Sequence, residues 1–191
     1  MKNALKQVQF PRILHLATHG FFLSDLEPAL PLNPLAGELM TAARAPVVPT
    51  TENPLLRSGL ALAGFNLRQS GSEDGVLTAL EAAGLDLQGT ELVVLSACDT
   101  GVGEIANGEG VYGLRRALTI AGARSQLMSL WQVADIGTAA LMVDYYDRLL
   151  QGEGRSEALR QAQLALLQDP QYRHPYYWAA FIFQGDWTKT H

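Results

Sequence analysis

Residues 91–101 read ELVVLSACDTG, and this stretch decides how the rest of the chain is interpreted. Its first seven residues are almost continuously apolar and rich in valine and leucine, which is typical of a strand buried on both faces of a parallel sheet. The run ends directly in Cys98, the only cysteine of the chain, which Asp99 follows. The end of this strand is therefore the first candidate for a chemical site.

Four further apolar runs have the same character, and they cover residues 12–18, 59–65, 124–131 and 178–184. Between the runs, apolar residues recur at helical spacing over residues 77–83, 110–121, 135–150 and 156–167. Thr78 is a plausible cap for the first of these helices, and Gly122 a stop for the second. The alternation predicts one domain over residues 1–191, a three-layer α/β/α sandwich around a mainly parallel sheet. An α+β domain with a mixed sheet is the alternative.

Composition excludes several classes of protein. The net charge of −5, with charges of both signs mixed along the chain, leaves no basic stripe for direct nucleic-acid binding. No apolar run approaches 18 residues, and the N-terminus lacks the apolar stretch of a signal peptide, so we expect a cytoplasmic protein without a membrane partner. A single cysteine excludes an internal disulfide and any thiolate-based zinc site.

Two of the predicted strands end in reactive residues: residues 12–18 lead into His19-Gly20, and residues 91–97 into Cys98. Because ligands bind beyond the carboxyl ends of strands in α/β sheets, neighbouring strands would bring the imidazole and the thiol together. The imidazole can then hold the thiol proton and activate the sulfur as a nucleophile. The N–H groups of Gly20 and Cys98 are candidates for stabilising the oxyanion of a tetrahedral intermediate. This chemistry requires no metal and no cofactor.

The residues also resemble a known family. Blocks that carry the resemblance are HLATHG, NPLLRSGLALAGFN, DGVLTALEAAGLDL, ELVVLSACDTG, GEGVYGLRRALTIAGARS, SLWQVAD and HPYYWAAFIFQGDW. In order and spacing, from about residue 14 to 187, they look like the CHAT family, whose caspase-like domains are usually found downstream of tetratricopeptide repeats. The resemblance implies a caspase/separase-type sheet, with His19 and Cys98 as catalytic dyad of a cysteine endopeptidase. It also implies a protein or peptide substrate, and a tetratricopeptide-repeat region as partner in cis or in trans.

The beginning of the chain departs from this pattern. Caspase-type folds place a strand, a helix and another strand before the histidine-bearing strand, whereas only about a dozen residues precede it here. We therefore expect either that the sequence is the C-terminal part of a longer protein or that its sheet lacks an edge, with unpaired backbone groups exposed.

Two aspartates are candidates for substrate binding, and each has a simpler interpretation. Asp99 can line a pocket for a basic substrate side chain, or it can be a solvated turn residue. Asp135 can supply negative charge to the same pocket, or it can cap the helix over residues 135–150, which its residue type favours. His15 lies four residues from His19, about 13 Å along a strand, so we expect a structural role rather than a shared metal. Trp131 and Trp178 are expected in the core.

Two rival functions remain open. Gly101, Gly103 and Ala106 fit a relaxed dinucleotide-binding pattern, but Glu104 and Glu109 place negative charge where a pyrophosphate would lie. A caspase-like scaffold or peptide-binding module without catalysis is the stronger rival. In the endopeptidase interpretation, residues 24–53, which hold five of the nine prolines, and residues 101–110 form the rims of the substrate site.

Overall fold

The computed structural model describes residues 2–22, 54–67, 73–99, 109–131 and 133–189. Within these ranges a six-stranded sheet has the order β3-β2-β1-β4-β5-β6. Its strands are β1 (Ile13–Phe22), β2 (Ser58–Ala61), β3 (Val76–Thr78), β4 (Leu92–Asp99), β5 (Ser125–Ser129) and β6 (Phe181–Gly185). The pairs β1–β4 and β4–β5 are parallel, and the pairs β1–β2, β2–β3 and β5–β6 are antiparallel. The sheet is therefore mixed, with a parallel centre.

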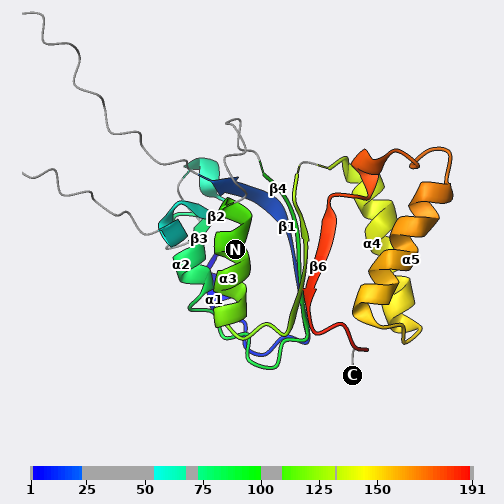
Figure 1. The fold of residues 1–191 in the computed structure, drawn as a ribbon. Helices are drawn as coiled ribbons and strands as arrows, with labels where there is room; N and C mark the ends of the chain where they lie inside the picture. The colour runs from blue at the N-terminus through cyan, green and yellow to red at the C-terminus, as the bar shows by residue number, and fades with distance from the viewer. Residues whose placement is uncertain (1, 23–53, 68–72, 100–108, 132, 190–191) are drawn as a thin grey trace, which may run out of the picture.

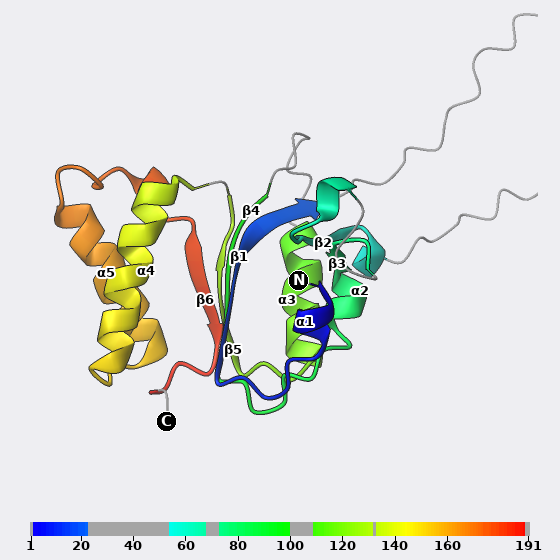
Figure 2. The ribbon, with the colours of Figure 1, turned by 180° about the vertical axis from the view of Figure 1, so that it is seen from behind.

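Helices cover both faces of this sheet, as the two opposite views show (Figures 1 and 2). One face carries α1 (Lys2–Lys6), α2 (Ala79–Ala82) and α3 (Glu109–Ile120), and the other carries α4 (Asp135–Leu150) and α5 (Arg155–Gln168). Three short 3₁₀ helices complete the described elements: η1 (Pro54–Leu56), η2 (Phe65–Leu67) and η3 (Pro175–Tyr177). The predicted three-layer α/β/α sandwich is confirmed, but the described sheet is mixed rather than mainly parallel, since three of its five strand pairs are antiparallel.

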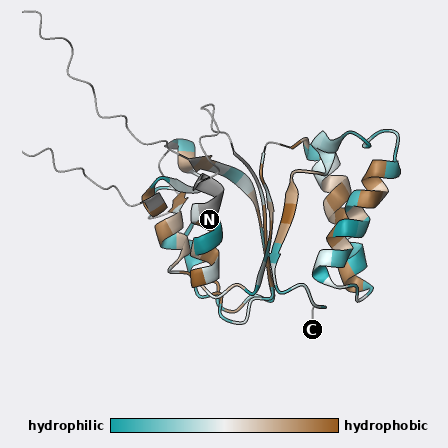
Figure 3. Ribbon diagram, viewed as in Figure 1, coloured by the Kyte–Doolittle hydropathy of each residue, from teal (hydrophilic) through white to brown (hydrophobic). Residues whose placement is uncertain are grey.

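Strand β4 explains why the apolar run in residues 91–97 is continuous. Val93 and Leu95 belong to the core under α2 and α3, whereas Leu92 and Val94 belong to the core under α4 and α5. All four side chains are at most 3% exposed, because alternate residues of a central strand point into opposite layers. In Figure 3, β6 is largely apolar, whereas α5 alternates between apolar and polar residues, as expected for an element with one solvated face.

The sequence signals for helix ends have mixed outcomes. Thr78 caps α2 as predicted: its hydroxyl accepts from the Glu81 N–H at 3.2 Å, and the Glu81 carboxylate accepts from the Thr78 N–H at 3.1 Å. Gly122 follows α3 with φ 108°, a backbone conformation that favours glycine at a helix end. The interpretation of Asp135 as the cap of α4 is wrong, because Ala134 is the N-cap and makes no side-chain capping bond. Asp135 is instead the first helical residue.

The outer strands differ from the sequence-based expectation. Residues 59–65 and 178–184 form shorter strands than predicted, and β3 escaped prediction because its three residues precede α2 directly. Strand β1 is not at an edge, since β2 pairs along one side of it and β4 along the other. The edges of the described sheet fall on β3 and β6, and a short strand such as β3 offers few unpaired backbone groups. Among the described residues, none of the helices has the length and apolar character needed to cross a membrane.

Candidate functional site

The topology of the sheet singles out one point on it. From β1 the chain continues to β2 on one side of the sheet, and from β4 it continues to β5 on the other side. The chain segments that follow β1 and β4 thus lead to opposite sides of the sheet. A crevice opens between them beyond the carboxyl ends of the two strands, and open α/β sheets bind ligands in such a crevice. The carboxyl ends of β1 and β4 hold His19 and Cys98, respectively.

Backbone register brings these two positions side by side. In the parallel pairing of β1 and β4, His19 is the partner of Cys98, and Gly20 is the partner of Asp99. Neighbouring strands lie about 4.8 Å apart, which is within the reach of two side chains that share a proton. The condition for bringing the two residues together, that their strands be neighbours, is therefore met. Residues 79 positions apart in the sequence meet at one end of the sheet, as the colours of Figure 1 let the reader follow.

Several predicted features lie outside the described residues. These are the side chains of Cys98 and Asp99, the proposed substrate rim of residues 24–53, and the part of the other rim up to residue 108. The glycine-rich pattern at residues 101–106 is among them. Gly20 is described: it is buried within β1, between Leu60 of β2 and Asp99 of β4. Its role as an oxyanion donor stays a prediction.

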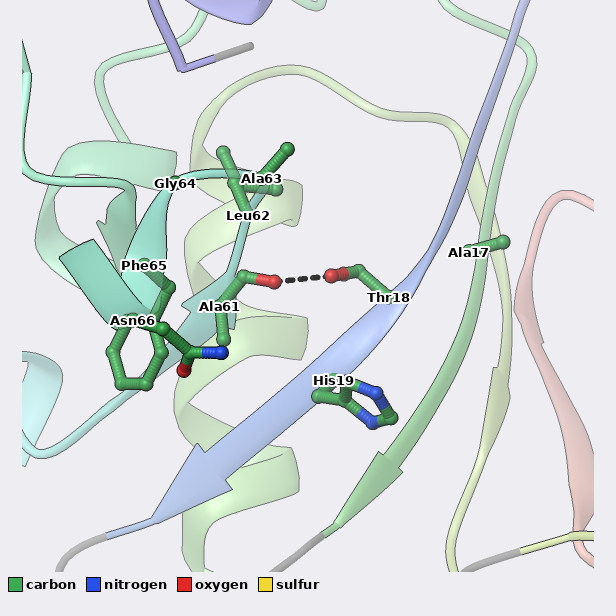
Figure 4. A pocket seen from close by; sticks show the side chains of 9 residues that line it. All are labelled: Ala17, Thr18, His19, Ala61, Leu62, Ala63, Gly64, Phe65 and Asn66. Atoms are coloured by element: carbon green, nitrogen blue, oxygen red, sulfur yellow. Dashed lines mark hydrogen bonds between the residues drawn. The ribbon is translucent and has the colours of Figure 1, made fainter. Parts of the chain in front are cut away.

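Two open hollows meet at His19. The first has a volume of about 670 Å³ and is lined by the end of β1 and by residues 61–66; it is mostly apolar (Figure 4). In that view Thr18 donates a hydrogen bond to the carbonyl oxygen of Ala61, and His19 projects from the adjacent position of β1. The second hollow, of about 440 Å³, lies between β1 and α4 and includes Ser96 and Asp135. His19 is exposed and lines both, so it lies on the ridge between them.

His15, which lines the second hollow, joins Ser96 and Tyr146 in a chain of three polar side chains. Nε2 of His15 lies 3.1 Å from the Ser96 hydroxyl, and its Nδ1 lies 3.0 Å from the Tyr146 hydroxyl. Burial lowers the pKa of His15 below its ordinary value, so the ring is neutral at pH 7 and uses one nitrogen as donor and the other as acceptor. Both nitrogens are thus occupied by partners within the domain. The structural role predicted for His15 fits this arrangement.

The remaining predicted residues separate into two groups. Asp135 lines the same hollow as His19. Trp178 packs partly buried against the core under α4 and α5, as predicted, but Trp131 is 36% exposed, so its assignment to the core is wrong. No group of three or more metal-binding side chains occurs in the part of the chain that the structure describes.

Sequence reasoning missed Ser96 and Tyr146. A signal for Ser96 existed, because a residue two positions before Cys98 in a strand belongs to the same face of the sheet. No comparable signal existed for Tyr146, since its contact with His15 spans 131 positions and depends on where α4 crosses the sheet.

Comparisons with known proteins identify a family and a relative. A family model described as the CHAT domain matches residues 1–186, which confirms the resemblance noted in the sequence blocks. Tetratricopeptide repeat protein 28 from Homo sapiens is 32% identical over 114 residues, or 60% of this chain. The aligned segment spans 4% of that protein's length, so the similarity concerns one small part of a long polypeptide.

Proposed function

Because the chain belongs to the CHAT domain family, which is related to the caspase-like peptidases, we propose that it is a cysteine endopeptidase with Cys98 as nucleophile and His19 as base. The observation that supports this proposal is the backbone register, which pairs His19 with Cys98 at the carboxyl ends of two parallel strands. A nucleophile and a base from distant parts of the chain then lie within reach of each other at the crevice of the sheet.

The proposed reaction proceeds through an acyl-enzyme. The Cys98 thiolate attacks the scissile carbonyl carbon and forms a C–S bond, while the carbonyl electrons move onto the oxygen. When this intermediate collapses, the C–N bond breaks and the His19 imidazolium gives its proton to the leaving amine. A water molecule, deprotonated by the neutral imidazole, then attacks the thioester carbonyl carbon. The C–S bond breaks, which releases the acid and regenerates the Cys98 thiolate beside the imidazolium. The N–H groups of Gly20 and Cys98 are the proposed donors to the oxyanion.

The two hollows support cleavage within a chain rather than at its end. A peptide that crosses the ridge at His19 can place residues on both sides of the cleaved bond in contact with the domain. Asp135 lines the hollow beside α4, and we propose that this hollow accepts a basic side chain, with Asp99 as a second acidic candidate. The other hollow, lined by Leu62 and Phe65 among others, suits an apolar side chain.

The partner that we propose is a tetratricopeptide-repeat region, in the same polypeptide or in another. Support for it comes from the relative named above, which carries these repeats in its name and contains a segment similar to this chain.

The deciding experiment uses the fact that Cys98 is the only thiol. Iodoacetamide alkylation is measured across pH in the wild type, in His19→Ala and in His15→Ala as a matched control on the same strand. A thiol without a base reacts with a midpoint near about 8.5, whereas a thiol paired with an imidazole has a midpoint below about 7.5. We expect the low midpoint in the wild type and in His15→Ala, and its loss in His19→Ala. A midpoint near 8.5 in all three proteins would refute the dyad.

The rival function, a scaffold that binds peptides without cleaving them, is separated by a second measurement. A peptide library is incubated with the wild type, Cys98→Ala and Asp135→Asn. The endopeptidase proposal expects cleavage that Cys98→Ala abolishes, with a preference for basic residues that Asp135→Asn weakens. A scaffold binds peptides equally with and without the thiol and yields no cleavage product.

A further inference from the structure

Helix α4 has a second apolar face, in addition to the one that it buries. Leu141 and Tyr145 point into the core and are 0% exposed. Roughly opposite to them lie Ile136, Val143 and Leu150, which are 68%, 62% and 86% exposed. Isolated apolar residues on a surface need no explanation, but these three large ones recur on one side of the same helix. We call these three residues the α4 stripe.

The spacing of the α4 stripe identifies the kind of partner. Its members are separated by seven residues, the repeat with which one helix packs along another. A ligand pocket or an extended peptide would impose no such spacing. The stripe therefore has the form of one side of a helix–helix contact.

The surface beside the α4 stripe leaves room for such a helix. At the end of the stripe an apolar hollow of about 340 Å³ is lined by Ile13, Tyr146 and Leu150, together with Arg12 and Leu149. Ile13 is 37% exposed, and the residues that follow it on the same face of β1 are exposed as well. Since packed helices lie 8–10 Å apart, one more helix placed beside α4 would cover both the hollow and part of this open face.

Charge distinguishes between the possible occupants. Helical periodicity places Asp135 and Asp147, both exposed, on the two sides of the α4 stripe. The nearest cation of the helix, Arg148, pairs with Asp144 at 3.1 Å and with Glu153 at 3.3 Å. Along the helix itself the flanks of the stripe are therefore acidic; the one cation that lines the hollow at its end, Arg12, lies 3.6 Å from the Glu91 carboxylate. A second copy of this chain would bring two acidic flanks together, whereas a helix with lysine or arginine beside its apolar row would complement them.

The area of a contact along α4 favours a tethered helix over a separate protein as the partner. A helix of 16 residues is about 24 Å long and about 10 Å wide, so a contact along α4 covers on the order of 240 Å². A stable complex between separate proteins buries about 800 Å² on each partner. A helix of the same polypeptide, or one held close by other contacts, needs less, because tethering supplies an effective concentration in the millimolar range.

We propose that the α4 stripe docks an amphipathic helix with basic flanks, supplied by the tetratricopeptide-repeat region. This inference rests on the repeat partner of the proposed function, and not on whether Cys98 is catalytic. Tetratricopeptide repeats are pairs of helices, so such a region is a source of helices.

The test is a titration followed by NMR of methyl groups. The probe is a peptide of about 21 residues that forms one helix, with leucine every seven residues, lysine on the flanking positions and alanine elsewhere. We expect saturable shifts confined to the methyl groups of Ile136, Val143, Leu150 and their neighbours, with a dissociation constant in the high micromolar to millimolar range. The same peptide with glutamate in place of lysine should bind roughly tenfold more weakly or worse.

Matched variants complete the test. Val143→Glu and Leu150→Glu change exposed residues and should keep the circular dichroism of the wild type while weakening peptide binding roughly tenfold or more. Ile120→Glu, at the end of α3 and 56% exposed, is the control and should bind normally. Equal binding of the lysine peptide to Val143→Glu and the wild type overturns the proposal, as does the absence of any binding. A dimer in sedimentation equilibrium that Val143→Glu dissociates also overturns it, because a second copy is then the occupant. None of these results depends on peptidase activity, so the dyad of His19 and Cys98 is tested separately, by the alkylation and cleavage experiments.

Discussion

Removal of the hydroxyl group from two consecutive tyrosines of α4, Tyr145 and Tyr146, should change the free energy of unfolding in opposite directions. Tyr145 is 0% exposed, and among the described residues none offers its hydroxyl a hydrogen-bond partner. Burial also raises its pKa above the ordinary value, followed by a smaller effect of the neighbouring Tyr146. The Tyr146 hydroxyl, in contrast, lies 3.0 Å from Nδ1 of His15.

The magnitudes follow from this difference. An unpaired buried hydroxyl costs about 1–3 kcal/mol, so Tyr145→Phe should stabilise the domain by about 1 kcal/mol after the small void is allowed for. A lost hydrogen bond of ordinary geometry costs about 0.5–1.5 kcal/mol, so Tyr146→Phe should destabilise the domain by about 1 kcal/mol. For a domain of this size each kcal/mol shifts Tm by about 2–4 °C. The two variants should therefore differ by about 4–8 °C.

Thermal unfolding by circular dichroism, with urea titration as a second probe, measures both effects. The control is His15→Ala, in which Tyr146→Phe should have little further effect because its partner is already gone. Equal destabilisation by Tyr145→Phe and Tyr146→Phe would refute the reasoning, since it would mean that the Tyr145 hydroxyl has a partner in solution.

Three further predictions concern the stability of the fold. Thr78→Ala removes the capping box of α2 and should destabilise the domain by about 0.5–2 kcal/mol in urea titration; no change would show that α2 does not depend on its cap. Lys2→Met should be destabilising at pH 6, with an effect that shrinks below about pH 4. The reason is that the hydrogen bond from Lys2 holds the pKa of Asp74 below its ordinary value, so the stabilisation exists above the unfolded pKa and is lost as pH falls through the folded one. An effect of Lys2→Met that is constant with pH contradicts this. Leu127→Ala, at 0% exposure, should destabilise by about 2–5 kcal/mol, and Leu150→Ala, at 86% exposure, by less than about 0.5 kcal/mol, both measured by urea titration; similar losses would contradict the assignment of core and stripe.

The position of the candidate site has a simple physical basis in the fold. Parallel strands can be joined only by long crossovers, and α3 lies between β4 and β5 in the chain. The antiparallel strands β2 and β3 extend the sheet on the other side of β1 and bury its edge. The crevice therefore opens between β1 and β4, where His19 and Cys98 are register partners. A fold of this kind holds the candidate residues on the ends of two strands, which favours precise geometry over mobility.

Much of the architecture could be read from local patterns. The continuous apolar run before Cys98 specifies a strand buried on both faces, because only such a strand needs apolar residues at every position. Recurrence at helical spacing specified α4 and α5 nearly to their ends, since one face of each helix must be apolar to bury it. The family blocks likewise depend only on sequence, and they are sufficient to identify His19 and Cys98 as the candidate dyad.

Other features depend on contacts between distant residues, which no local pattern encodes. The antiparallel direction of β2 and β6, the pairing of His19 with Cys98, and the contact of His15 with Tyr146 follow from how whole elements pack. An apolar residue of α4 can be buried, as Leu141 is, or exposed to solvent, as Val143 is, and the outcome depends on which element packs against that face of the helix. The sequence by itself thus determined the elements and the candidate reactive residues, because these depend on neighbours along the chain. Only the tertiary structure decided which of them meet, since register and layer packing are set by the burial of the whole core.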